Sequence, residues 1–452
     1  MKLKSMEFTN FRCFESLKIN FDQNLTVFIA SNGSGKTSIL DAIAYGYGPY
    51  LSRLPKISGI GIKKDIDIYI NHDGEHAPFL RLDLFTEDMH WDLTQRRDLS
   101  KKTRADVTKP HGRDELLKYA DSLIDAENEK QPYTLPIIAY YGTDRAFDPV
   151  SRRENFKKEF SRFEAYSGAL RSSANFRRLF EWFNAMENIE RRGVTEHRDF
   201  DYKLPELEAV RKAIGYVLPK VSNPRIEMRP VRFLVDFEQN GVSRTFRIEQ
   251  LSDGYKMALA MVMDIAARMG EANPDEDNIL ETGGVVLIDE VDQHLHPSWQ
   301  QRILADLTRT FPNVQFIVTT HSPQVLSTVS SKSIRLLEHE TDHETGRLQS
   351  FAREPSVENQ GVASSYLMAE FMGVDPVPDM DQSRWLSEYK AMIQLNQSET
   401  HEGLKLRRDL EEHFGPRHKE LLECDRMLRL EKMKSKLSMI KAKDLTNNKQ
   451  KD

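Results

Sequence analysis

Hydrophobic positions follow two periods along this chain, and the change between the periods marks the predicted elements. Alternation near the N-terminus predicts a β-hairpin, and the apolar run 25–30 predicts a third strand. Mainly apolar runs at 135–141, 285–288 and 314–319 predict the strands of a parallel sheet, with the runs 135–141 and 285–288 buried on both faces. Apolar residues at helical spacing separate the last two runs. This order of strands and helices predicts an α/β fold.

Weaker patterns fill the intervals between these runs. Further strands are predicted at 66–70, 80–85, 231–237 and 245–248, and helices at 114–126, 154–190 and 205–218. From residue 362 onwards the apolar residues recur near helical spacing. We therefore expect a helical C-terminal region.

The composition is that of an ordinary soluble protein with room for two or three domains, since 452 residues are 39% hydrophobic and 30% charged. No apolar run approaches the roughly 20 residues of a membrane span, and the chain begins with a predicted strand rather than a signal peptide. Cys13 and Cys424 offer neither a disulfide framework nor a metal spacing, so we expect a cytoplasmic protein with no membrane partner. The net charge of -6 argues against a wholly basic nucleic-acid coat but allows a local basic patch.

A glycine-containing loop follows the run 25–30 and precedes a predicted helix. It matches the phosphate-binding pattern G-x-x-x-x-G-K-[ST], except that Ala30 replaces the first glycine. Loop amides and a helix start donate to phosphate, Lys36 reaches the β- and γ-phosphates, and Thr37 holds Mg²⁺. We therefore expect ATP and Mg²⁺ as cofactors, bound by Asn32, Gly33, Ser34, Gly35, Lys36, Thr37 and Ser38. Because Ala30 narrows the loop, a nucleotide-gated scaffold that does not hydrolyse ATP stays an open alternative.

Two carboxylates and a histidine come directly after two of the buried runs. Asp289 and Glu290 follow one run, and His321 follows the next. The carboxyl ends of parallel strands meet at the edge where open α/β sheets bind ligands. The pattern predicts a Walker B site, in which Asp289 joins Thr37 as a metal ligand, Glu290 is the catalytic base and His321 contacts the γ-phosphate. Two satisfied acids at strand ends are the purely structural alternative.

A second anion site is predicted at 250–256, where Ser252 and Gly254 begin an apolar helix. The stretch resembles the signature motif of the ABC ATPases, with Asp253 in place of the usual glycine. The resemblance implies that Ser252 and Gly254 contact the γ-phosphate bound by the opposite protomer. It therefore implies a homodimer or a higher oligomer.

The order of these parts resembles the cytosolic ABC ATPases of the SMC, RecF and OLD type. The stretch 10–14 resembles their N-terminal hairpin, in which Arg12 approaches the nucleotide phosphates; an exposed hairpin arginine is the alternative. The implied fold class is α/β, with an ABC-type P-loop ATPase sheet, a helical insertion and a helical C-terminal region. The expected parts are an N-terminal ATPase lobe with the Walker A loop at 1–150, the insertion at 151–222, a C-terminal ATPase lobe at 223–355 and a helical partner or oligomerisation region at 356–452.

Five stretches resemble the PtuA-like ATPases of the Septu and retron antiphage systems, namely 139–143, 162–166, 250–256, 287–300 and 311–324. The resemblance implies an ATPase that controls an HNH nuclease encoded beside it. In retron versions a reverse transcriptase and its RNA–DNA product join the complex. In transporter-like ATPases a loop that contains a glutamine leaves the sheet at the place that corresponds to the end of the run 135–141. This chain has no glutamine there, so we expect Thr143, Asp144 or Arg145 to take its role.

Two basic stretches are candidate nucleic-acid contacts, an expected exposed loop at 96–113 and an aromatic-rich segment at 152–178. A solvated loop and a helical core are the respective alternatives. The acidic residues Asp375, Asp379 and Asp381 would suit a nuclease metal site only on the ends of strands, and the tail predicts too few strands. A RecF-like DNA-repair ATPase and an OLD-like ATPase-nuclease remain as alternative functions.

Overall fold

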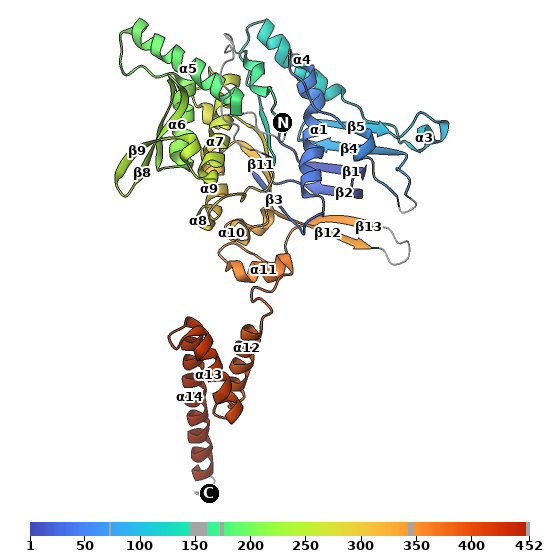
Figure 1. Cartoon of the computed structure of the whole chain (residues 1–452). Coiled ribbons are helices and arrows are strands. Elements are labelled where there is room, and N and C mark those ends of the chain that lie inside the picture. The colour runs from blue at the N-terminus through green and yellow to red at the C-terminus, as the bar shows by residue number, and fades with distance from the viewer. Residues whose placement is uncertain (72–73, 145–160, 172–175, 342–347, 449–452) are drawn as a thin grey trace. The chain divides into compact units, whose positions relative to one another are not determined.

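The computed structural model describes residues 1–71, 74–144, 161–171, 176–341 and 348–448. The chain folds into two compact units, Met1–Met372 and Gly373–Asp452 (Figure 1). The larger unit contains three sheets, and the smaller one is helical. Among the helices that the structure describes, none combines the length and the apolar character needed to cross a membrane.

A six-stranded sheet in the order β13-β12-β3-β11-β10-β6 is the framework of the larger unit. Its strands are β3 (Leu25–Ile29), β6 (Ile137–Tyr141), β10 (Gly284–Ile288), β11 (Val314–Thr319), β12 (Ile334–Thr341) and β13 (Leu348–Arg353). All neighbours pair in parallel except β12 and β13. Every residue of β6, β10 and β11 is buried, which confirms the predicted strands.

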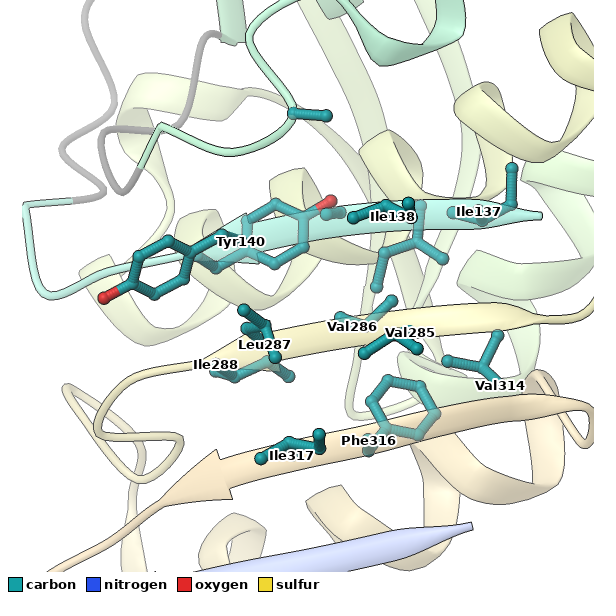
Figure 2. Close-up of a cluster of buried hydrophobic side chains, with 14 of the residues drawn as sticks. Ile137, Ile138, Tyr140, Val285, Val286, Leu287, Ile288, Val314, Phe316 and Ile317 are labelled. Carbon is teal, nitrogen blue, oxygen red and sulfur yellow. The ribbon is translucent and has the colours of Figure 1, made fainter. Parts of the chain in front are cut away.

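Figure 2 shows the apolar side chains along these three strands, among them Val286, Leu287 and Phe316. Their burial fixes the register, because a shift by one residue would exchange the two faces of each strand. Parallel pairing then brings the carboxyl ends of β3, β10 and β11 to one edge of the sheet. The predicted phosphate loop, Asp289 with Glu290, and His321 follow these three ends, whereas Arg12, Ser252 and Gly254 come from other elements.

An antiparallel sheet in the order β2-β1-β4-β5 contains the N-terminal hairpin. Its strands are β1 (Ser5–Phe11), β2 (Phe14–Asn20), β4 (Phe79–Phe85) and β5 (His90–Arg96). The strand predicted at 66–70 is wrong, because its first two residues end the short helix α2 (Lys64–Asp67), and Ile68 and Ile70 form only isolated bridges, to Phe11 and His76. Asp67, Ile68 and Tyr69 are buried between the exposed Ile66 and Ile70, and Asp67 forms an ion pair with Arg12, so the burial does not alternate as in a core strand.

The basic stretch 96–113 is not the simple loop that was expected. It begins at the end of β5 and contains the short helix α3 (Lys101–Asp106), which Ser100 caps through its hydroxyl. Lys101, Lys102 and Arg104 are exposed, as the nucleic-acid hypothesis requires. The helix α4 (Asp114–Asn128) that follows confirms the prediction for 114–126.

A three-stranded sheet and three helices make up the next part of the unit. They are β7 (Val221–Met228), β8 (Val231–Gln239), β9 (Val242–Arg247), α5 (Phe176–His197), α6 (Pro205–Val217) and α7 (Asp253–Ala272). The single helix predicted at 154–190 is wrong, because a 3₁₀ helix spans Arg162–Tyr166 and α5 begins only at Phe176. Residues 154–160 lie outside the described residues. The remaining helices are α1 (Lys36–Arg53), α8 (Pro297–Gln300), α9 (Ile303–Thr310), α10 (Pro323–Leu326) and α11 (Ser364–Met372).

A buried polar network joins α7 to β6 and α5. Tyr141 donates to Asp264 at 2.7 Å, and Arg268 donates to the same carboxylate oxygen at 2.7 Å. One turn further along α7, Glu271 pairs with Arg178 of α5. All of these groups are nearly inaccessible to solvent, so each charge depends on its partner.

The smaller unit consists of α12 (Asp381–Gln394), α13 (His401–Phe414) and α14 (Lys419–Asn448). Its small core is made by Tyr389, Ile393, Leu410, Leu421 and Cys424. These helices confirm the helical C-terminal region predicted from the apolar spacing.

Candidate active site

Two glycines shape the loop between β3 and α1. Gly33 has a φ of 82° and Gly35 a φ of 91°, a region that side chains disfavour. At Gly35 space is also limiting, because a Cβ there would lie 2.5 Å from Phe14 Cζ and 2.6 Å from Cys13 Sγ. The N-terminal hairpin therefore packs directly against the predicted phosphate loop.

The Lys36 ammonium bonds to carbonyls of its own loop. Its Nζ donates to the carbonyls of Ala30 and Ser31 at 2.9 Å each. Burial lowers the pKa of Lys36, while the carboxylates of Asp289 and Glu290 act in the opposite direction. The Lys36 ammonium is partly desolvated and lies at the loop, so an anionic ligand bound there would stabilise its charge.

Thr37 and Asp289 are in direct contact although 252 positions separate them in the chain. The Thr37 hydroxyl donates to Asp289 Oδ2 at 2.7 Å. The other carboxylate oxygen accepts from the Thr319 hydroxyl at 2.5 Å. Two hydroxyl partners thus hold both oxygens of a carboxylate that is only 2% exposed.

These donors fit a magnesium ion. Mg²⁺ prefers oxygen ligands, and it usually takes one or two from the protein while phosphates and water supply the others. Thr37 Oγ1 and Asp289 Oδ2 lie together beside the phosphate loop, which meets that requirement. The described residues contain no cluster of three or more His, Cys, Asp or Glu side chains suited to a metal. A metal bound mainly through its nucleotide fits this composition.

Glu290 and His321 follow the neighbouring strands β10 and β11 at the same edge of the sheet. The Glu290 backbone N–H donates to the Thr319 hydroxyl at 2.8 Å, and Glu290 itself has a φ of 47°. The His321 backbone N–H points at Asp292 Oδ1, 3.4 Å away, and the Thr320 hydroxyl donates to the same oxygen at 2.5 Å. Both predicted residues therefore lie at the same edge of the sheet, in two neighbouring hydrogen-bond groups centred on Thr319 and on Asp292.

Gly254 of the predicted signature packs closely against the segment that follows Glu290. A Cβ at Gly254 would meet the His294 carbonyl oxygen at 2.5 Å, so the glycine is required for this close packing. Ser252 precedes α7 as its N-cap residue and is exposed. Gln300 braces the same segment, because its amide donates to the Leu295 carbonyl at 2.9 Å and accepts from Ser322 at 2.8 Å.

Arg12 is a partly buried residue of a charged network rather than an exposed hairpin arginine. It donates to Asp41 at 2.7 Å and to Asp67 at 2.8 Å, and its guanidinium lies 3.4 Å from Ser38 Oγ. Although burial opposes its charge, the hydrogen bonds to these carboxylates raise the pKa of Arg12. Tyr140, at the end of β6, donates to Asp41 at 2.9 Å and extends the network to the central sheet. The guanidinium is thus held beside the first turn of α1.

Several other predicted residues do not join this arrangement. Thr143 and Asp144 are exposed, and Arg145 lies outside the described residues. In the basic stretch 152–178, the prediction that Arg178 contacts nucleic acid is wrong, because its side chain is buried in an ion pair with Glu271. The positions 152–160 lie outside the described residues, whereas Arg171 and Arg177 are exposed. The exposed Asp379 and Asp381 both pair with Arg384.

The sequence reasoning missed three residues that organise the site, namely Thr319, Asp292 and Gln300. Thr319 directly precedes Thr320, His321 and Ser322, and its position at the strand end could have indicated a role beside the carboxylates. Asp292 and Gln300 lie within the stretch 287–300 that was singled out as a whole. Asp292 accepts from Thr320 and Gln300 accepts from Ser322, which both follow β11, so no local spacing indicated these contacts.

A phosphate loop after β3, an acidic pair after β10, a histidine after β11 and a serine–glycine helix start on α7 together define an ABC-type P-loop ATPase. A family model described as an AAA domain matches residues 5–218. Among solved structures, the SMC head bound to the C-winged helix domain of ScpA has 16% identity and a TM-score of 0.45, over 78% of this chain and 98% of that chain.

Curated relatives define the family more narrowly. The chain is 30% identical over 493 residues to the retron Ec83 probable ATPase of Escherichia coli, with 94% of this chain and 86% of the relative covered. It is 24% identical over 395 residues to the Septu protein PtuA of Bacillus mycoides, over 84% of this chain and 46% of that protein. The chain belongs to the PtuA-like ATPases of retron and Septu defence systems.

Proposed function

We propose that this chain binds ATP with Mg²⁺ at the loop after β3 and hydrolyses it to control an associated nuclease. The observation that carries the proposal is the contact between Thr37 and Asp289, with Glu290 as the next residue. It unites a loop suited to phosphates, a pair of ligands suited to Mg²⁺ and a carboxylate suited to activating water. Such a combination serves phosphoanhydride chemistry.

Each residue has a separate role in this mechanism. The loop amides of Asn32 to Ser38 and the Lys36 ammonium bind the phosphates, and Thr37 with Asp289 holds the metal, which would neutralise charge on the phosphate oxygens. Glu290 orients and deprotonates the attacking water, and His321 contacts the γ-phosphate. Arg12 adds positive charge beside Ser38. The catalysis is positioning and electrostatic stabilisation, with no covalent intermediate on the protein.

We propose a homodimer, or a higher oligomer built from it, as the ATP-binding unit. Ser252 is exposed at the start of α7, where an N-terminal helix end favours anions. Gly254 packs on the segment after Glu290, so the signature and the catalytic carboxylate are linked within one protomer. In a symmetric dimer each signature would complete the site of the other protomer.

Membership of the retron and Septu family supports partners for this ATPase. We propose an HNH nuclease subunit and, in a retron system, a reverse transcriptase with its RNA–DNA product. The exposed lysines and arginine of α3 are candidate nucleic-acid contacts. ATP can shift a nuclease between states only if the nuclease has different affinities for the two nucleotide states of the ATPase.

A Glu290→Gln variant tests the catalytic assignment. We expect ATP binding to persist and the steady-state ATPase rate to fall about 100-fold or more, the usual contribution of a general base. Glu129→Gln, at the exposed end of α4, is the matched control and should hydrolyse ATP like the parent. A Glu290→Gln protein as active as the parent would remove this glutamate from the mechanism.

A cleavage assay tests the division of labour. The purified chain should leave DNA and RNA intact with Mg²⁺ or Mn²⁺, with and without ATP, and cleavage should require the separate nuclease. Metal-dependent cleavage that disappears when Asp375, Asp379 and Asp381 are replaced would favour the OLD-like alternative. Activity in repair without any nuclease partner would favour the RecF-like one.

A further inference from the structure

His339 on β12 contacts the phosphate loop from outside the motif. Its Nε2 lies 3.1 Å from the carbonyl oxygen of Ser34. Because a carbonyl can only accept, Nε2 carries the hydrogen and donates it. The other ring nitrogen, Nδ1, lies 2.9 Å from the hydroxyl of Ser350 on β13, which donates to it in the neutral ring. The two contacts together fix both the tautomer and the direction of the imidazole.

Phe14 fixes the plane of the same imidazole. Its ring stacks on His339 with 6.1 Å between centroids and 22° between planes. The same ring, which is fully buried, leaves no space for a Cβ on Gly35. His339 and Phe14 therefore act on one peptide unit, the first through the Ser34 carbonyl and the second through the α-carbon of Gly35.

The hydrogen bond from His339 to the Ser34 carbonyl determines the direction of the Gly35 N–H. In a planar trans peptide the C=O and N–H groups point in opposite directions. Since the Ser34 carbonyl points to His339, the Gly35 N–H points away from β12. Glycine allows a peptide to rotate more freely than other residues do, so a peptide ending in Gly35 benefits from an external anchor. The amides of such loops are the donors that bind phosphate.

We propose that His339 is a positioning residue for nucleotide binding, which holds the Ser34–Gly35 peptide with its N–H directed at the phosphates. This inference rests on the proposed function, because it requires the loop to bind a nucleotide. β12 pairs with β3, on the side of β3 opposite to β11, while Asp289 and Glu290 follow β10. His339 therefore acts on affinity for the nucleotide, and the hydrolytic step belongs to other residues.

Two substitutions separate the hydrogen bond from the ring packing. His339→Phe keeps a ring against Phe14 and removes the donor, whereas His339→Gln keeps an N–H donor and removes the ring. We expect His339→Phe to weaken Mg²⁺–ATPγS binding about five- to tenfold in calorimetry, the effect of one hydrogen bond. His339→Gln should recover most of that loss. The KM for ATP should rise with the Kd while kcat stays within about twofold, as expected for a residue that affects binding alone.

The outcomes distinguish this inference from the proposed function. Parent-like affinity in His339→Phe, or an equal loss in His339→Phe and His339→Gln, overturns the positioning role and leaves the ATPase assignment intact. A parent protein that does not bind ATPγS overturns the ATPase assignment itself. If thermal unfolding shows that His339→Phe is misfolded, Ser350→Ala tests the positioning role instead, because it removes only the hydroxyl that orients the His339 ring. Weaker ATPγS binding by Ser350→Ala supports the role, and unchanged binding contradicts it.

Discussion

The Thr319 side chain on β11 donates a hydrogen bond of 2.5 Å to the Asp289 carboxylate at the end of β10. The same hydroxyl accepts the backbone N–H of Glu290 at 2.8 Å. One hydroxyl therefore fixes the proposed metal ligand and the backbone of the proposed catalytic base. Neighbouring parallel strands make this possible, because Ile288 pairs with Val318, directly before Asp289 and Thr319.

Thr319→Val should reduce ATP hydrolysis while the protein stays folded. Valine keeps the shape of threonine but leaves a buried oxygen of Asp289 without this donor, which costs about 1–3 kcal/mol in stability. We expect kcat to fall about tenfold, since each 1.4 kcal/mol lost from the transition state is a factor of ten. Thr310→Val is the control: its buried hydroxyl donates to the Asp306 carbonyl within α9. Equal ATPase rates for the two variants would contradict the role of Thr319.

Gly254→Ala should uncouple the signature helix from the segment after Glu290. The added methyl would lie 2.5 Å from the His294 carbonyl, so α7 or that segment must move. We expect the ATPase rate to fall about tenfold or more and the stability to fall by about 1–3 kcal/mol, as overpacking usually costs. The control is Gly215→Ala on α6, which faces open space and should stabilise the helix by about 0.5–1 kcal/mol. Normal hydrolysis in Gly254→Ala would show that the close contact is not needed.

Mixing two inactive variants tests the proposed sites shared between protomers. Lys36→Ala should abolish nucleotide binding in its own loop, and Ser252→Arg should block the signature surface. A heterodimer of the two retains one intact composite site. After subunit exchange at equal concentrations we expect about a quarter of the parent ATPase rate, because half of the dimers are mixed and each has one of two symmetric sites. Differently tagged chains verify the exchange, and a verified heterodimer without activity would refute completion in trans.

The affinity for ATP should depend on pH through Lys36. Burial lowers the pKa of its amine below the ordinary value of lysine, with Asp289 and Glu290 opposing that shift. Bound phosphates favour the ammonium, so its pKa is higher in the complex than in the free protein. Affinity is therefore full below the free-state pKa and falls as the pH rises through it, by at most about tenfold per pH unit for one proton. Calorimetry between pH 7 and 10 in two buffers should detect proton uptake, and a flat profile would contradict this view.

The central strands and their carboxyl edge could be predicted from the sequence because local signals specify them. Mainly apolar runs identify buried parallel strands, and polar residues directly after such runs must lie at the carboxyl edge. The direct contact of Thr37 with Asp289 follows from that edge, although the roles of these residues stay predictions.

Features that depend on long-range partners were not predictable in the same way. At 66–70 an alternating pattern suggested a strand, but Asp67 is buried because Arg12 pairs with it across 55 positions. The strands β12 and β13 carry many charged residues, including Glu338, Glu340 and Arg353, which pair with one another. Nothing in that pattern indicates that His339 reaches the phosphate loop.

The charged network inside the larger unit has a mechanical consequence. Separating a buried ion pair costs about 3–5 kcal/mol, because one charge is left without compensation. On α7, Glu271 is held in this way by Arg178 of α5, whereas Asp264 and Arg268 pair within α7 and reach β6 through the Tyr141 hydroxyl. A rotation of α7 that left α5 in place would separate Arg178 from Glu271, so we expect the two helices to move together. The 20 residues of α7 begin at Asp253, so the predicted signature motif lies at the N-terminal end of this helix and would be displaced with it.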